Sequence, residues 1–141
     1  MSLESESESQ FYPQSSIVDT LEKIYLRSPI LNIFQRVYVP DIREFAYCIG
    51  YYWEDLMVYA LSLERAYSHN LYLTDCEFRV DSEIIELYDT IPAFNLFDNA
   101  QVIHTGKIGK ITGIELMPAY GWHYTVNNEP CTFSELKLIE P

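Results

Sequence analysis

Residues 107–138, KIGKITGIELMPAYGWHYTVNNEPCTFSELKL, carry the pattern that decides the fold. Apolar residues alternate with polar or small ones through residues 108–116, and the alternation slips by one position at Thr112-Gly113, where glycine permits a bulge or a sharp bend. Residues 122–126, WHYTV, then alternate strictly, which places every second side chain on the same face of a strand. The stretch therefore predicts β structure with one bent and one regular strand.

Turn residues separate the strands of this stretch. Pro118 and Gly121 predict one turn, because proline fixes φ and glycine allows a positive φ. Residues 127–130, NNEP, predict a second turn, and Ser134-Glu135 predicts a short turn before a last strand. Short strands joined by tight turns in this rhythm are typical of a small barrel of the SH3-like kind.

The upstream part of the chain shows the same order of features: a strand, a glycine-bent strand, an aromatic strand, a loop, and a turn into a final strand. The matched positions are residues 31–34 (LNIF) with 94–97 (FNLF) and Gly50 with Gly113 at an offset of 63, Tyr59 with Tyr124 at 65, and Glu77 with Glu135 at 58. We therefore expect a mainly β protein of two tandem SH3-like small barrels. One continuous β-barrel or sandwich is the alternative.

The boundaries of these parts follow from composition. The acidic repeat ESESES at residues 4–9 cannot bury a core, so residues 1–15 are expected to form a disordered tail. Residues 16–90 are expected to form the first barrel, with a short N-terminal helix or strand. Residues 91–141 are expected to form the second. Residues 81–89, at the end of the first of these parts, lie between the two repeated patterns and fit a short helix or a plain linker.

The charge balance limits the partners. The chain has 21 acidic and nine basic residues, a net charge of -12, and no cluster of Lys or Arg. We therefore expect no nucleic-acid ligand and no anionic membrane surface, since both would be repelled. An acidic mimic of nucleic acid that inhibits a DNA-binding protein is one alternative function. No apolar run approaches the ~20 residues that span a bilayer, and no signal peptide opens the chain, so a cytoplasmic protein is expected.

No catalytic or metal-binding motif is evident. The histidines are far apart and the cysteines show no paired spacing, which predicts no metal site and no cofactor; they are His69, His104 and His123, and Cys48, Cys76 and Cys131. One enzymatic alternative pairs Cys131 with His123 across the turn at 127–130. We otherwise expect a protein that is not an enzyme.

Aromatic residues near the bent strands are the candidate contact surface. They are Tyr51, Tyr52, Trp53, Tyr120, Trp122 and Tyr124. Each alone is explained by core packing, but exposed rings beside acidic residues would suit a protein or peptide partner that carries Lys, Arg or Pro. The expected function is a non-catalytic protein-interaction module or accessory subunit.

Two resemblances add to this reading. Residues 109–139 resemble SH3-like barrels of the KOW, Tudor and photosystem-accessory kind, in which a G-x-[IV] strand bend precedes W-x-Y-x-V and a closing E-L. Residues 24–140, with IYLRSP, RVYVP and FAYCIGYYWE, resemble a small uncharacterised family of filamentous cyanobacteria. The resemblances imply an architecture and a host but no activity, and the chain lacks the basic loops of the KOW nucleic-acid binders.

Overall fold

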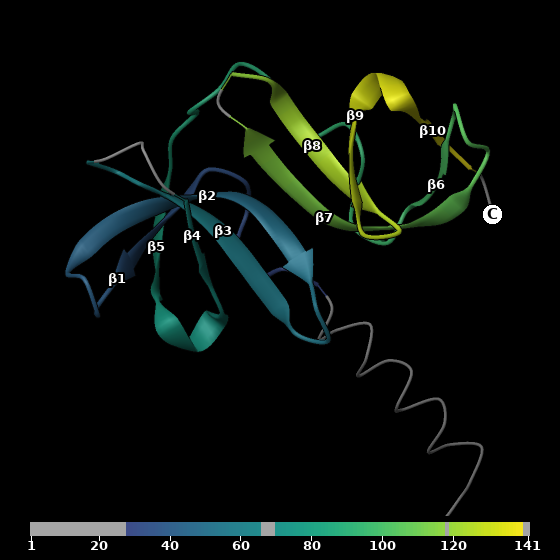
Figure 1. Ribbon diagram of the computed structural model, residues 1–141. Coiled ribbons are helices and arrows are strands. Elements are labelled where there is room, and N and C mark those ends of the chain that lie inside the picture. Colours follow the sequence, from purple (N-terminus) through teal and green to yellow (C-terminus); the bar gives the residue numbers. More distant parts are fainter. Residues whose placement is uncertain (1–27, 66–69, 118, 140–141) are drawn as a thin grey trace, which may run out of the picture.

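The computed structural model describes residues 28–65, 70–117 and 119–139, and this part of the chain is mainly β, as expected (Figure 1). Ten strands form one open sheet in which every neighbouring pair is antiparallel. The predicted acidic tail and the predicted N-terminal helix or strand lie outside the described residues. Two short 3-10 helices, η1 and η2, interrupt the strands.

The elements have the following bounds. The strands are β1 Gln35–Val39, β2 Glu44–Trp53, β3 Met57–Leu63, β4 Asn70–Leu73, β5 Arg79–Ile84, β6 Asn99–Val102, β7 Ile108–Met117, β8 Gly121–Val126, β9 Glu129–Thr132 and β10 Leu136–Leu138, and the 3-10 helices are η1 Asp75–Glu77 and η2 Phe133–Glu135. We refer to the described residues up to 84, which contain β1–β5, as the first half, and to those from 85 onward, which contain β6–β10, as the second half.

One predicted turn and one predicted helix or linker are shorter in the structure, because strands extend into them. Only Asn127 and Asn128, both with positive φ, form the turn between β8 and β9, so Glu129 and Pro130 belong to β9. Consecutive residues with positive φ match the twist of a two-residue hairpin. The region 81–89 was expected to be a helix or a linker, but its first part, to Ile84, completes β5 because it pairs with the edge of β1.

The same order of strand pairings occurs in both halves. In the first half β1 pairs with β2 and β5, β2 with β3, and β3 with β4. In the second half β6 pairs with β7 and β10, β7 with β8, and β8 with β9. A 3-10 helix precedes the last strand of each half.

Both 3-10 helices begin with the same capping box, formed by a threonine and a glutamate three residues later. Oε2 of Glu77 accepts hydrogen bonds from the backbone N–H and hydroxyl of Thr74, at 2.9 and 3.0 Å. Oε1 of Glu135 does the same for Thr132, at 2.8 and 3.1 Å. These bonds fix the chain direction into β5 and β10 and account for the matched glutamates in the sequence.

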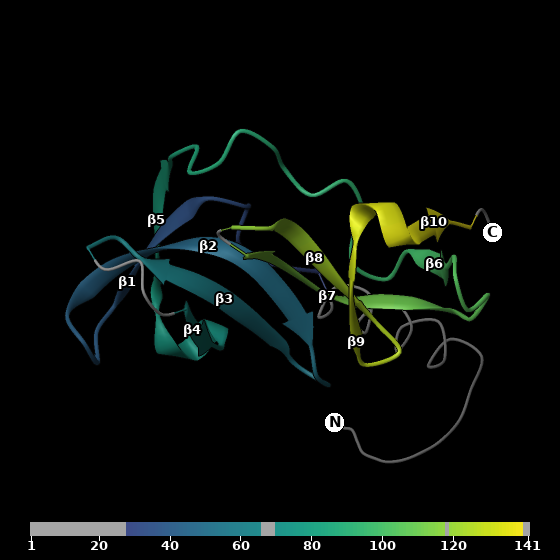
Figure 2. The same cartoon turned by 45° about the horizontal axis from the view of Figure 1, so that its top comes forward.

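The two halves join where β2 pairs with β7, which we call the seam (Figures 1 and 2). Its register places Gly50 opposite Glu115, Tyr51 opposite Ile114, and Tyr52 opposite Gly113. The strands approach so closely that a Cβ on Gly50 would lie 2.0 Å from the carbonyl oxygen of Ile114. The predicted bends are confirmed, because the register of each long strand shifts just before its glycine.

Each half also sends a phenylalanine toward the other. Phe34 belongs to the apolar cluster of the second half, where its ring centroid lies 6.0 Å from that of Trp122. The Phe97 ring lies 5.9 Å from the Trp53 ring of the first half. Both phenylalanines have a positive φ, of 69° and 71°, which a bulky residue adopts only when the surrounding packing holds it there. The cores of the two halves are therefore interlocked.

Candidate functional site at the seam

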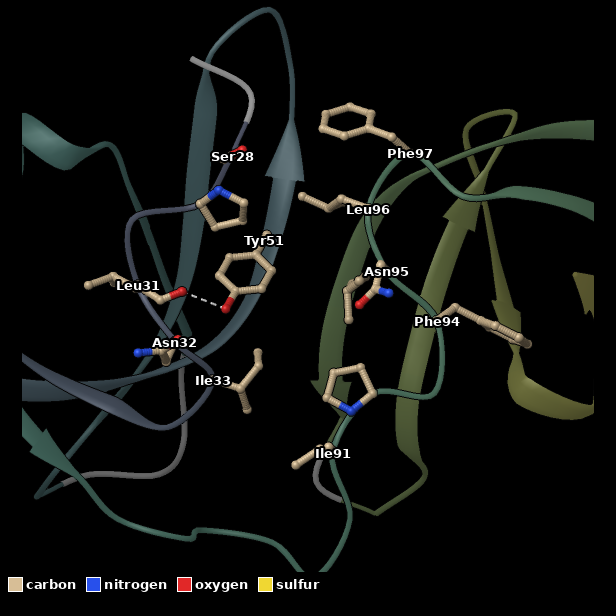
Figure 3. Close-up of a pocket in the computed structure, with 13 residues that line it drawn as sticks. Ser28, Leu31, Asn32, Ile33, Tyr51, Ile91, Phe94, Asn95, Leu96 and Phe97 are labelled. Carbon is tan, nitrogen blue, oxygen red and sulfur yellow. Dashed lines mark hydrogen bonds between the residues drawn. The ribbon is translucent and has the colours of Figure 1, made fainter. Parts of the chain in front are cut away.

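A pocket of about 650 Å³ opens on one face of the seam (Figure 3). Its walls come from residues 28–33 of the first half and residues 91–97 of the second, and Tyr51 and Ile114 of the seam line it between them. In Figure 3, Leu96 and Phe97 project toward the first half, whereas Phe94 points away into the second. The pocket thus exists only where the two halves meet. We call it the seam pocket.

The two wall segments are matched at an offset of 63 residues, with Pro29 matching Pro92 and Asn32 matching Asn95. Each segment is held by one buried tyrosine of its own half. The Ile30 N–H donates to the Tyr59 hydroxyl and the Ala93 N–H donates to the Tyr124 hydroxyl, both at 2.8 Å. Burial raises the pKa of both tyrosines. These hydroxyls therefore stay protonated at neutral pH while they position the walls.

The chemistry of the seam pocket is apolar with a few polar groups. Tyr51 is buried, and its hydroxyl donates to the Leu31 carbonyl oxygen at 2.6 Å (Figure 3). The side-chain amides of Asn32 and Asn95 are exposed and make no hydrogen bond with another described residue. Sites of this composition bind an apolar group and orient it through a small number of hydrogen bonds.

The opposite face of the seam holds a buried carboxylate. Glu115 is 4% exposed and is the one charged residue that is buried among those the structure describes. Its oxygens accept hydrogen bonds from the Tyr52 hydroxyl, the Asn70 side-chain amide and the Tyr72 hydroxyl, the last at 2.8 Å. Glu115 takes part in none of the ion pairs formed within residues 28–65, 70–117 and 119–139. Neutral donors from the first half therefore stabilise a charge carried by the second.

Hydrogen bonding to a carboxylate keeps these tyrosines in their neutral form. Burial, and then the bond to Glu115, raises the pKa of Tyr52 and of Tyr72. Loss of either phenolic proton would place a second negative charge beside the carboxylate. Both rings are therefore held in place as neutral donors.

The six predicted contact residues do not gather on one surface. Tyr51 and Tyr52 point to opposite faces of β2, so only Tyr51 lines the seam pocket. Trp53 is half-buried against Phe97. Tyr120 is 80% exposed, and its ring lies edge-on to His123 at 6.4 Å between centroids.

The other two of the six are structural in their contacts. Trp122 is buried, and its Nε1 donates to the Thr90 carbonyl oxygen at 3.0 Å. Tyr124 is buried and holds the wall segment through Ala93. Both therefore support the second wall of the seam pocket without lining it.

The structure does not assemble the predicted Cys131–His123 pair. Cys131 lies opposite Tyr124 in the β8–β9 pairing and His123 lies opposite Thr132, so the thiol and the imidazole point to opposite faces of the sheet. Cys131 is buried, and burial followed by nearby acidic groups raises the pKa of its thiol. Among the described residues, no three His, Cys, Asp or Glu side chains are placed to hold a metal ion.

Sequence reasoning missed the wall segments and the surroundings of Glu115. A signal for the walls was present, because the match between residues 31–34 and 94–97 extends upstream to Pro29 and Pro92. No comparable signal marked Glu115, which occupies an ordinary polar position of an alternating strand.

The chain belongs to a family described as "Protein of unknown function (DUF1392)", whose model matches residues 13–140. No curated protein and no solved structure matches the chain. Within the described part, no helix has the length and apolar character needed to span a membrane.

Proposed function

We propose that this member of the DUF1392 family is a non-catalytic interaction module or accessory subunit that binds a segment of another protein in the seam pocket. The observation that carries the proposal is the pocket itself: about 650 Å³, walled by apolar residues from both halves and open to solvent. Ile91, on one wall, is 70% exposed. An exposed apolar side chain at the rim of an apolar pocket is typical of a surface that a partner covers.

We also propose that each half is an SH3-like barrel. Support comes from the pairing order, in which the first strand of each half pairs with both the second and the last, and from the 3-10 helix before the last strand. In this arrangement each wall segment leads into the first strand of its barrel, β1 or β6. A partner bound between them would contact both.

The partner segment is expected to be extended, with an aliphatic or aromatic side chain as its anchor and with basic residues beside it. The apolar lining selects the anchor, and the exposed side-chain amides of Asn32 and Asn95 can bond to the backbone of the segment. The net charge of -12 favours basic flanks and repels acidic ones.

A peptide library displayed on phage and selected against the whole protein tests this proposal. Selected peptides should share an apolar anchor with Lys or Arg nearby. They should lose binding to an Ile91→Asp variant, because the substitution removes an apolar contact with the anchor and covering the new carboxylate with an apolar group costs its hydration. An Ile103→Asp variant is the matched control, since Ile103 is also exposed in the second half but does not line the pocket.

Two results would overturn the proposal. Selection that enriches no peptide would show that the seam pocket does not receive extended chains. Peptides that bind the Ile91→Asp and Ile103→Asp variants equally well would place the interaction elsewhere. If no peptide is enriched and a neutral apolar dye binds the pocket, the pocket is a small-molecule site instead.

A further inference from the structure

A second, smaller pocket lies on the opposite face of the seam from the one described above. It has a volume of about 450 Å³ and is lined by Tyr52, Glu54, Val58, Tyr72 and Thr74. All five residues belong to the first half: Tyr52 lies on β2, Glu54 in the β2–β3 turn, Val58 on β3, Tyr72 on β4, and Thr74 directly after β4. We call it the tyrosine pocket.

The two tyrosine rings of this pocket are held at a fixed angle. Their centroids are 6.1 Å apart and their planes meet at 65°. Both hydroxyls donate to the carboxylate of Glu115, one to each oxygen, so neither ring can turn away without breaking a hydrogen bond to a buried charge. Tyr72 remains 52% exposed, which leaves part of its ring open to a ligand.

The pocket is negative, and none of the described residues that line it carries a positive charge. Glu54 is exposed, and neither Glu54 nor Glu115 takes part in the ion pairs that the described residues form. Those pairs involve Arg36 and Arg65 with other acids. Glu54 lines the pocket together with the two tyrosine rings, and the hydroxyls of these rings bond to the Glu115 carboxylate. Such a site attracts a positive charge, because carboxylates are negative and the face of an aromatic ring is electron-rich.

The corresponding place in the second half has a different composition. The strand registers make Glu115 the counterpart of Tyr52, His123 the counterpart of Val58, and Pro130 the counterpart of Tyr72. Neither ring of the pair therefore has an aromatic counterpart. The pair of tyrosines is therefore not part of the sequence pattern that the two halves share, and it occurs in the first half alone.

From this geometry we propose that the tyrosine pocket binds an alkylammonium group, the side chain of a lysine on a partner protein, with Tyr52 and Tyr72 in contact with the cation and Glu54 as its counter-charge. The seam pocket is on the other face, so this site does not depend on the function proposed for it.

The test titrates small ammonium ligands into the whole protein. Binding is monitored by NMR on the methyl signals of Val58, which lines the pocket. Choline and the amide of Nα-acetyl-lysine should shift these signals, with dissociation constants on the order of millimolar. The neutral carbon isostere of choline and the lysine derivative acetylated at Nε should bind about tenfold more weakly, because they lack the charge.

Variants assign the binding to the named groups. Glu54→Gln and Tyr72→Leu should each weaken choline binding several-fold, whereas Tyr72→Phe should retain most of it because the ring remains. Glu129→Gln and Tyr120→Leu, both at exposed positions of the second half, are the matched controls and should bind as the wild type does. If Tyr72→Leu fails to fold, Glu54→Gln still tests the site, because Glu54 is exposed.

Each of three results would overturn the proposal. Equal binding of choline and its neutral isostere would show that charge is not recognised. Unchanged affinity in Glu54→Gln and Tyr72→Leu would place the ammonium elsewhere. Tighter binding of ethylguanidinium than of any ammonium would identify an arginine site. These binding measurements at the tyrosine pocket do not depend on whether the peptide selection at the seam pocket succeeds.

Discussion

The Tyr52 hydroxyl and the Glu115 carboxylate are hydrogen-bonded across the seam, although the two residues occupy equivalent places in the two halves. The register explains how they meet, because Tyr52 lies opposite Gly113 while Glu115 lies opposite Gly50. Each glycine leaves room beside the larger residue of the other half: a Cβ on Gly113 would lie 2.4 Å from the Tyr52 ring. Because the first half has a donor where the second half has an acceptor, the two strands of the seam are complementary in hydrogen bonding.

Glu115→Gln should lower the free energy of unfolding by about 1–3 kcal/mol. The amide of glutamine presents a donor where Tyr52, Asn70 and Tyr72 all donate, so at least one of these partly buried hydrogen bonds to the buried residue 115 is lost. Urea unfolding followed by tryptophan fluorescence measures the change. Glu129→Gln, at an exposed position, should change stability by less than about 0.5 kcal/mol. Equal stability of the two variants would mean that the carboxylate is not held as described.

Gly50→Ala should destabilise the protein by about 3 kcal/mol or more. The added Cβ would lie 2.0 Å from the Ile114 carbonyl oxygen and 2.8 Å from the Glu115 Cα, and backbone atoms cannot move aside without separating β2 from β7.

Gly109→Ala is the matched control for this change. The three atoms nearest to its Cβ would all belong to the side chain of Asn127, which can rotate away, so a small loss is expected. Thermal unfolding of the two variants distinguishes the cases. A Gly50→Ala protein as stable as the Gly109→Ala protein would contradict the close approach at the seam.

Stability should fall as the pH rises above 10. Burial, and then the hydrogen bond to Glu64, raises the pKa of Tyr47 from 10.0 to about 12. Above pH 10 the unfolded chain loses a proton that the folded protein keeps, so the stabilisation is complete below pH 10 and disappears as the pH rises through about 12. Tyr51 and Tyr52, whose pKa values burial also raises, act in the same direction.

Denaturant unfolding at a series of alkaline pH values measures this slope. In Tyr47→Phe the slope between pH 10 and 12 should be shallower by the contribution of one proton, whatever the absolute stability of the variant. Identical slopes in the wild type and in Tyr47→Phe would show that this tyrosine titrates normally in the folded protein.

One of the three cysteines should react quickly with Ellman's reagent in the native protein. Cys76 is exposed, whereas Cys48 and Cys131 are buried. Burial raises the pKa of Cys48 to about 12 and raises that of Cys131, which removes the reactive thiolate as well as the access. Cys76→Ser should therefore show no fast phase until denaturant is added. A fast reaction of Cys131 in that variant would restore the hypothesis of an enzyme using Cys131 and His123.

Local pattern alone was enough to predict β7, β8 and the bends of β2 and β7, but not the start of β9 at Glu129 or the extension of β5 to Ile84. Alternation in residues 108–116 and 122–126 corresponds closely to β7 and β8, and the glycines at 50 and 113 coincide with the register shifts of β2 and β7. These features depend on neighbouring residues only, because side chains alternate along any strand and glycine alone tolerates the crowded positions. The turn was predicted at the right place but over four residues, 127–130, instead of two. Pro130 belongs to β9, because proline can occupy an edge strand.

The sequence by itself determined that this chain is mainly β, acidic and built from strands in a recurring order. Only the tertiary structure decided that β2 pairs with β7, that residues 28–33 and 91–97 face each other across a pocket, and that Glu115 is buried beneath side chains from β2 and β4. Alternation indicates that a strand has two faces, but not what covers either of them. Asn70 and Tyr72 lie 45 and 43 residues from Glu115, and contacts over that separation leave no periodic trace in the sequence.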